Sequence, residues 1–335
     1  MINQDEIDAV ILWVDGNDPK WKAEKAKYQA NAHQDSSASR YRDWGTLQYI
    51  FRGIEKYAPW IRKVHFVTCG HYPDWLNMEC SKLHFVRHED FIPKENLPTF
   101  SSRAIDLNFH RIAGLTEKFI YFNDDTFLTG AVRKEDFFRN GLPCDIFSER
   151  PISAGSGVFN HSLLNDIQVL SKYFDRRTVL KKHWKKILVP RYGKIFLYNF
   201  FWYLMPFRYF CGLYYNHLPM SYRKSTWQKL WELEEDVLTE TISHKFRSIT
   251  DVNQYLFNYW QLMSGEFYPM NMDRQGRYFA ITGVENKELL NAIKQNKYKR
   301  ICINDNCSQE VFESVKDNII AAFESILPEK SGFEK

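Results

Sequence analysis

Several short stretches of the sequence place acidic or basic side chains where they could do chemistry. The most informative is Asn123-Asp124-Asp125, which directly follows an apolar run. Paired carboxylates at a strand end are suited to Mg²⁺ or Mn²⁺, because these ions prefer oxygen ligands. An ion held there could bridge a diphosphate. The alternative is that these acids only cap a helix or form a turn.

A second stretch, Trp13-Val14-Asp15-Gly16-Asn17-Asp18-Pro19, also follows an apolar run. An acid at the end of a parallel strand, followed by glycine, allows a nucleotide to approach the backbone closely. Asp-Gly is equally common in simple turns, so both interpretations stay open.

The third stretch contains His217, followed downstream by Arg247 and Asp251. A neutral histidine can take a proton from a hydroxyl near neutral pH, and an arginine can clamp phosphate oxygens. Taken singly, each of these residue types is more often structural or at the surface. A fourth stretch, Cys302-Ile303-Asn304-Asp305, ends another short strand and is uninformative by itself.

Alternating elements must position these side chains. Short β-branched and aromatic runs predict strands, and apolar residues at helical spacing predict helices. The predicted strands are 7–14, 63–69, 83–87, 118–123 and 299–303, and the predicted helices are 20–31, 43–57, 101–112, 226–246, 252–263 and 308–326.

This order favours an α/β fold with a mostly parallel sheet, in which ligands bind beyond the carboxyl ends of the strands. Beyond about residue 160 the pattern becomes helical and more basic. We therefore expect an α/β catalytic domain built from 1–160 and 265–330, with a helical insertion at 161–264.

Composition narrows the function classes. The chain has 335 residues and a net charge of only +4, so we expect no nucleic-acid partner. The acidic N-terminus lacks the features of a signal peptide, and the six cysteines form no CxxC pair. These features favour a cytoplasmic enzyme with reduced thiols.

The segment 181–215 is rich in Lys, Arg and aromatic residues. Its longest apolar run, 195–207, is too short for a bilayer span. Two interpretations stay open: a segment that lies in the membrane interface, at the inner face of the membrane, or a buried helical subdomain.

Taken together and in this order, the four stretches resemble the Stealth family, which includes bacterial capsular polysaccharide phosphotransferases. The similarity also covers the connecting sequence, in particular Arg40-Tyr41-Arg42-Asp43, Leu97-Pro98-Thr99-Phe100-Ser101-Ser102 and Phe119-Ile120-Tyr121-Phe122-Asn123. It extends over roughly positions 7–310. Thr46 and Asp106 depart from the residues that the family often carries there.

The resemblance implies a nucleotide-sugar transferase-like (GT-A or Rossmann-like) fold and a reaction at phosphorus. A hexose-1-phosphate or N-acetylhexosamine-1-phosphate would pass from a UDP-sugar to a hydroxyl of a glycan or lipid-linked oligosaccharide, and UMP would leave. The runner-up is a metal-dependent glycosyltransferase that releases UDP.

The resemblance also implies residue roles. His217 would act as base, Arg247 would stabilise the phosphoryl group, and Asp125 would belong to the catalytic set. The expected metal ligands are Asp124, Asp125 and Asp305. The expected contacts to the nucleotide-sugar are Trp13, Asp15, Gly16, Arg42, Asp43, Ser102, Asn123 and Asn304.

Overall fold

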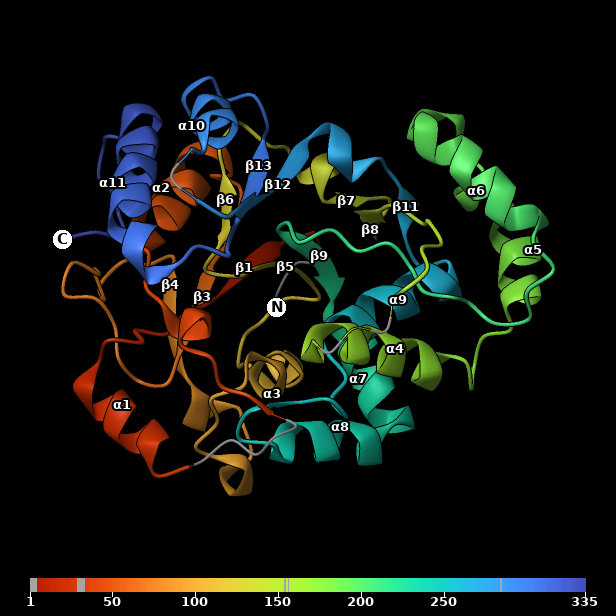
Figure 1. The fold of residues 1–335 in the computed structure, drawn as a ribbon, viewed down its shortest axis with the longest axis horizontal. Coiled ribbons are helices and arrows are strands. Elements are labelled where there is room, and N and C mark those ends of the chain that lie inside the picture. Colours follow the sequence, from red (N-terminus) through yellow and green to blue (C-terminus); the bar gives the residue numbers. More distant parts are fainter. Residues whose placement is uncertain (1–4, 29–33, 154, 156, 284) are drawn as a thin grey trace.

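A five-stranded sheet forms the centre of the computed structural model, which describes residues 5–28, 34–153, 155, 157–283 and 285–335 (Figure 1). The strand order is β4-β3-β1-β5-β9. The first four strands are parallel, and β9 pairs antiparallel with β5. The strands are β1 (Ile7–Leu12), β3 (Val64–Thr68), β4 (Leu83–Arg87), β5 (Lys118–Phe122) and β9 (Met220–Arg223).

The inner strands are covered on both faces, which explains their nearly continuous apolar sequences. In β1, Ile7, Ala9 and Ile11 belong to one hydrophobic core and Val10 belongs to the other. This alternation is the period of a strand with two buried faces. The predicted α/β class with a mostly parallel sheet is confirmed.

A second sheet adjoins the first. Its order is β12-β13-β6, with β12 parallel and β6 antiparallel to β13. The remaining strands form two smaller sheets, the three-stranded β11-β8-β7 and the two-stranded β10-β2. The bounds are β2 (Gln34–Asp35), β6 (Thr126–Leu128), β7 (Phe138–Arg139), β8 (Leu142–Asp145), β10 (Arg247–Ser248), β11 (Tyr268–Pro269), β12 (Gly276–Ile281) and β13 (Arg300–Asp305).

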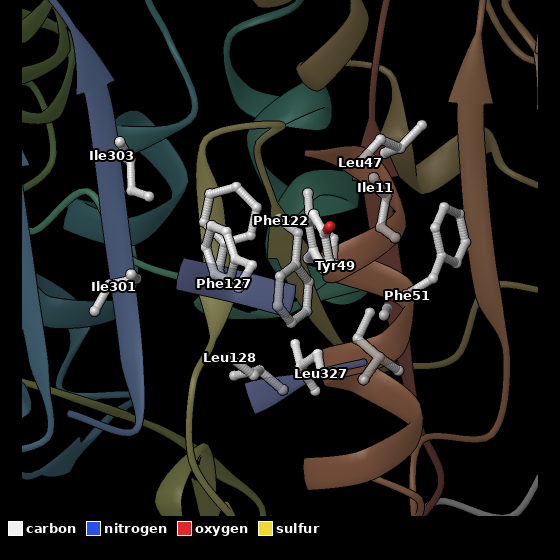
Figure 2. Close-up of a cluster of buried hydrophobic side chains, with 14 of the residues drawn as sticks. Ile11, Leu47, Tyr49, Phe51, Phe122, Phe127, Leu128, Ile301, Ile303 and Leu327 are labelled. Atoms are coloured by element: carbon white, nitrogen blue, oxygen red, sulfur yellow. The ribbon is translucent and has the colours of Figure 1, made fainter. Parts of the chain in front are cut away.

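Helices cover both faces of the central sheet. On one face α2 (Leu47–Tyr57), α10 (Lys287–Lys294) and α11 (Gln309–Ile326) pack with the second sheet around the first core, part of which Figure 2 shows. On the other face lies the second core, to which most of the remaining helices contribute. They are α3 (Ser102–Asp106), α4 (Val158–Leu170), α5 (Arg176–Ile187), α7 (Lys224–Leu233), α8 (Glu235–Ser243) and α9 (Tyr255–Ser264).

The other helical segments are shorter or lie at the edge of the molecule. They are α1 (Pro19–Ala26), α6 (Lys194–Leu204) and the 3₁₀ turns η1 (Ala38–Tyr41), η2 (His88–Asp90), η3 (Lys94–Asn96), η4 (Phe109–Arg111), η5 (Lys134–Asp136), η6 (Pro190–Tyr192) and η7 (Met272–Arg274).

Several predicted helices differ from the structure. The helix expected at 101–112 breaks into α3 and η4, because the Asn108 side chain donates to the Ala104 carbonyl and competes with the helical pattern (2.8 Å). The helix expected at 226–246 is interrupted at Glu234, whose φ/ψ of −133°/39° is not helical. The helix expected from residue 43 begins only at Leu47, because Gly45 has a φ of +60°.

The helix expected at 20–31 ends at Ala26, and its positions 29–31 lie outside the described residues. Within 161–264, β9 was not expected. Through β9 this largely helical segment joins the central sheet directly. Among the helices of the described residues, none is both long and apolar enough to cross a membrane.

Candidate active site

A cavity of about 940 Å³ opens where the central and second sheets meet. All but two of the site residues expected from the sequence line it. Those that do are Trp13, Arg42, Asp43, Ser102, Asn123, Asp124, Asp125, His217, Arg247, Asn304 and Asp305.

Asp124 and Asp125 lie at the junction between the two sheets. The chain leaves β5 at Phe122, turns through Asn123–Asp125 and enters β6 of the second sheet. The turn is closed by the Thr126 amide, which donates to the Asn123 carbonyl (3.1 Å). The Ile303 amide of β13 donates to the Asp125 carbonyl (2.8 Å). These bonds hold the acid pair against β13.

His217 reaches the acid pair because β9 is antiparallel to β5. Residues just before β9 therefore lie beside residues just after β5. The His217 Nε2 lies 3.2 Å from Asp125 Oδ2, and its Nδ1 lies 3.3 Å from the Tyr255 hydroxyl. Burial alone would lower the pKa of His217, but the charge and hydrogen bond of Asp125 outweigh it, so this pKa is raised. A basic imidazole thus sits beside a carboxylate.

The crowded carboxylates are suited to a cation. Burial, and then the charges of Asp125 and Asp43, raise the pKa of Asp124 to about 7. Asp125 Oδ1 is buried and accepts no hydrogen bond from the described residues. One ligand atom each of Asp125, His217 and Cys302 lies within 4.8 Å of the others. The oxygens of the acid pair suit Mg²⁺ or Mn²⁺, and the imidazole is a further nitrogen donor within reach.

Asp305 enters the cavity from the end of β13 and is already paired. Its carboxylate lies 3.1 Å from the Arg42 guanidinium and accepts from the Cys307 amide (3.0 Å). Arg42 also stacks over the Phe312 ring, with its guanidinium carbon 4.6 Å from the ring centroid. This contact fixes the orientation of Arg42 at the cavity wall.

Arg247 lies in β10 and is positioned by Ser102, whose hydroxyl accepts from its Nη2 (2.7 Å). Burial, and then the charges of Arg40 and Arg103, lower the pKa of Arg247 to about 10, so it remains charged at neutral pH. Arg40 and Arg103 line the same cavity. Arg103 is buried and paired with Asp251 (3.0 Å), and Arg40 is paired with Asp35 (2.9 Å). Arg247 has no acidic partner among the described residues and is the one of the three best suited to phosphate oxygens.

Asp15 and Gly16 are the two expected site residues that do not line the main cavity. Asp15 borders a smaller adjacent hollow, where its amide donates to His71 Nε2 (2.9 Å). A Cβ on Gly16 would lie 1.7 Å from the Tyr41 carbonyl oxygen. The glycine therefore allows the chain before Arg42 and Asp43 to pack directly on the loop after β1.

Sequence reasoning missed several residues that line the cavity or lie next to its acid pair. The Cys302 thiol lies 3.4 Å from Asp125 Oδ2, but its strand gave no sign of this proximity. Tyr215 and Tyr278 line the cavity and are more than a third exposed. The high aromatic content was the only signal for them. Asp106, noted only as a departure from the family, also lines the cavity, and burial raises its pKa to about 7.

Comparison with protein families places two conserved regions on this chain. The model described as "Stealth protein CR1, conserved region 1" matches residues 5–32. The model described as "Stealth protein CR2, conserved region 2" matches residues 40–144. These matches include the loop after β1, the chain that packs on it and the acid pair after β5.

Individual relatives match over nearly the full length. The chain is 41% identical to a "Capsular polysaccharide phosphotransferase WcwK" of Streptococcus pneumoniae, over 100% of both chains. It is 38% identical to a "Receptor polysaccharide phosphotransferase WefC" of Streptococcus oralis, over 98% of this chain and 99% of that one. It is also 38% identical to an "Exopolysaccharide phosphotransferase cps2G" of Lactiplantibacillus plantarum, over 98% and 96%.

Proposed function

This chain belongs to the Stealth family of polysaccharide phosphotransferases, and we propose that it transfers a hexose-1-phosphate or N-acetylhexosamine-1-phosphate from a UDP-sugar to a glycan hydroxyl. The acceptor is a growing capsular or exopolysaccharide chain, free or lipid-linked. The observation that carries the proposal is the convergence of His217, Arg247 and the acid pair on one cavity.

In the proposed reaction the acceptor oxygen attacks the sugar-linked phosphorus. The new P–O bond forms a phosphodiester, the P–O bond to UMP breaks, and UMP leaves. His217 takes the acceptor proton, and the neighbouring Asp125 carboxylate stabilises the resulting positive charge (3.2 Å). Such reactions depend mainly on positioning and charge neutralisation, which the cavity walls supply.

Two sets of cavity residues would neutralise charge on the transferring group. Arg247 binds the phosphoryl oxygens. Asp124 and Asp125 are the residues that would hold Mg²⁺ or Mn²⁺, and Asp305 is a further carboxylate of the same cavity. When bound, that ion would neutralise charge on the diphosphate.

The remaining walls are suited to the two substrates. The part of the cavity beside the strand ends is lined by Trp13, Arg42, Asp43 and Asn304. We propose that these residues bind the nucleotide-sugar. Tyr215 and Tyr278 offer aromatic faces, which stack well on the apolar faces of sugar rings.

Product analysis tests this proposal. The chain is incubated with each of several UDP-hexoses and UDP-N-acetylhexosamines together with an acceptor glycan. We expect UMP release and a phosphodiester signal in ³¹P NMR. Release of UDP without a phosphodiester would instead establish a glycosyltransferase, for which the same acid pair would be adequate.

A histidine variant tests the role of the base. His217→Ala should lower turnover by about 10²–10⁴-fold, the usual loss when a general base is removed. The matched control is His161→Ala, a partly exposed histidine in α4 that does not line the cavity. Near-normal turnover of His217→Ala would disprove the assignment.

A further inference from the structure

The helix α6 presents its apolar side chains to solvent. Leu197, Phe200, Phe201 and Leu204 recur at helical spacing on one side, and their exposed fractions are 68%, 48%, 55% and 61%. Figure 1 shows α6 together with α5 at the edge of the molecule. We call these four residues the α6 face. A soluble helix normally turns such a stripe toward the core.

The polarity of this helix is inverted. Its one polar residue in the middle, Asn199, is buried and donates to the Phe147 and Ile187 carbonyls (2.7 and 3.0 Å). These two hydrogen bonds fix the rotation of α6 about its own axis. With Asn199 turned inward, the apolar side of the helix faces solvent. Of the two interpretations of 181–215, a fully buried subdomain therefore does not apply to the α6 face.

The aromatic surface continues beyond the helix. Phe207 and Tyr209 are 43% and 55% exposed. Trp202 connects the helix to this extension, because its ring lies 6.0 Å from that of Phe201 and 5.8 Å from that of Phe207. Contiguous exposed apolar surface of this kind marks a site of interaction with a partner or a membrane.

The charge around this surface indicates the partner. Residues 176–215 contain nine Lys and Arg residues and no Asp or Glu. Lys181, Lys182, Lys185 and Lys194 are exposed. A second copy of the chain would bring the same basic segment against itself across a two-fold axis, which is unfavourable. An anionic surface is complementary to it.

We propose that the α6 face binds the surface of an anionic lipid bilayer. The helix has 11 residues and is about 16 Å long, roughly half the thickness of the hydrocarbon layer, so it lies in the interface and does not span it. Exposed aromatic and leucine side chains next to lysines are typical of such helices.

This surface is connected to the active-site cavity. Arg150, which lines the cavity, stacks over the Tyr198 ring of α6 with its guanidinium carbon 4.0 Å from the ring centroid. Membrane binding would therefore hold the cavity close to a bilayer, where a lipid-linked acceptor glycan would be found.

Vesicle flotation tests the proposal without any need for turnover. At low salt, the purified chain should float with vesicles of equal parts phosphatidylcholine and phosphatidylglycerol. Phe200→Ser/Phe201→Ser should lower the partition coefficient by about tenfold or more, because both half-exposed rings lose apolar contact with lipid. The matched control is Tyr72→Ser/Met78→Ser, which removes two side chains of similar exposure outside 181–215 and should leave binding unchanged.

A second variant tests the charge. Lys181→Gln/Lys182→Gln/Lys185→Gln should weaken binding by about a hundredfold, since each lysine near an anionic surface contributes about fivefold. Added salt or pure phosphatidylcholine vesicles should have a similar effect. Failure of the wild-type chain to bind anionic vesicles would overturn the proposal. So would a dimer that the Phe200/Phe201 variant dissociates while vesicle binding is unaltered.

Discussion

The buried ion pair between Arg103 and Asp251 supports the wall that carries Arg247. Arg103 Nη1 lies 3.0 Å from Asp251 Oδ2, and the two side chains are 4% and 0% exposed. The Ser248 amide also donates to Asp251 Oδ2 (2.7 Å), and His244 Nδ1 lies 2.7 Å from Oδ1. Asp251→Ala would remove the partner of all three groups at once.

We expect Asp251→Ala to lower the free energy of unfolding by about 3–5 kcal/mol, because removing one member of a buried pair leaves the other charge uncompensated. Arg103 keeps only its bonds to the Ser248 and Val158 carbonyls (2.9 and 3.2 Å). Removing both charges, in Arg103→Met/Asp251→Ala, should recover a large part of this loss, since no unpaired ion remains.

Urea unfolding of the two single variants, the double variant and the wild type measures this coupling. The control is Glu89→Gln, which breaks the exposed pair with Arg87 and should cost less than about 1 kcal/mol. A loss below about 1 kcal/mol in Asp251→Ala, or a double variant as unstable as the sum of the singles, would refute the reasoning.

Three further predictions concern the sheet, the loop after β1 and the metal. Burial alone would raise the pKa of Asp8, but the hydrogen bonds from His65 and Arg62 outweigh it, so the pKa is lowered. The charged Asp8 therefore stabilises the fold at neutral pH, and this stabilisation is lost only as pH falls below about 4. Asp8→Asn should therefore lose stability at neutral pH and show a flatter acid limb in pH-dependent unfolding; parallel curves would contradict this. Gly16→Ala should lower UMP release, because its Cβ would meet the Tyr41 carbonyl, whereas Gly157→Ala has open space and serves as control. Chelation with EDTA should abolish UMP release and added Mg²⁺ or Mn²⁺ should restore it; unaltered turnover would argue against a metal.

The elements with strong periodic patterns were predictable. Strands β1, β3, β4, β5 and β13 and helices α2, α9 and α11 lie where their apolar spacing placed them, within a few residues. The acids that follow β1 and β5, and Asp305 at the end of β13, were therefore correctly expected at the carboxyl ends of strands. Asp124, Asp125 and Asp305 do line one cavity. For Asp305 this grouping was implied only by the family resemblance, because its strand belongs to a second sheet that the spacing did not predict.

The residues that pattern could not place depend on short pairings between distant segments. Strand β9 has only four residues and lies in a segment that is otherwise mainly helical. In β12, half of the residues are exposed and their burial does not alternate regularly. A four-residue strand carries too little period-2 signal to be identified without its partner. Consequently the proximity of His217 to Asp125, and the position of Tyr278 on the cavity wall, required the structure.

The register between β5 and β9 explains why base and acids meet at all. Parallel strands bring only their carboxyl ends to this edge of the sheet. A base contributed by another parallel strand would therefore have to come after that strand in the sequence. Because β9 is antiparallel, His217 precedes it, and the pairing of Tyr121 with Met220 sets its distance from Asp125. A slip of one residue would turn Tyr222 from its buried position toward the opposite core. The same packing that stabilises the sheet therefore fixes the geometry of the proposed proton transfer.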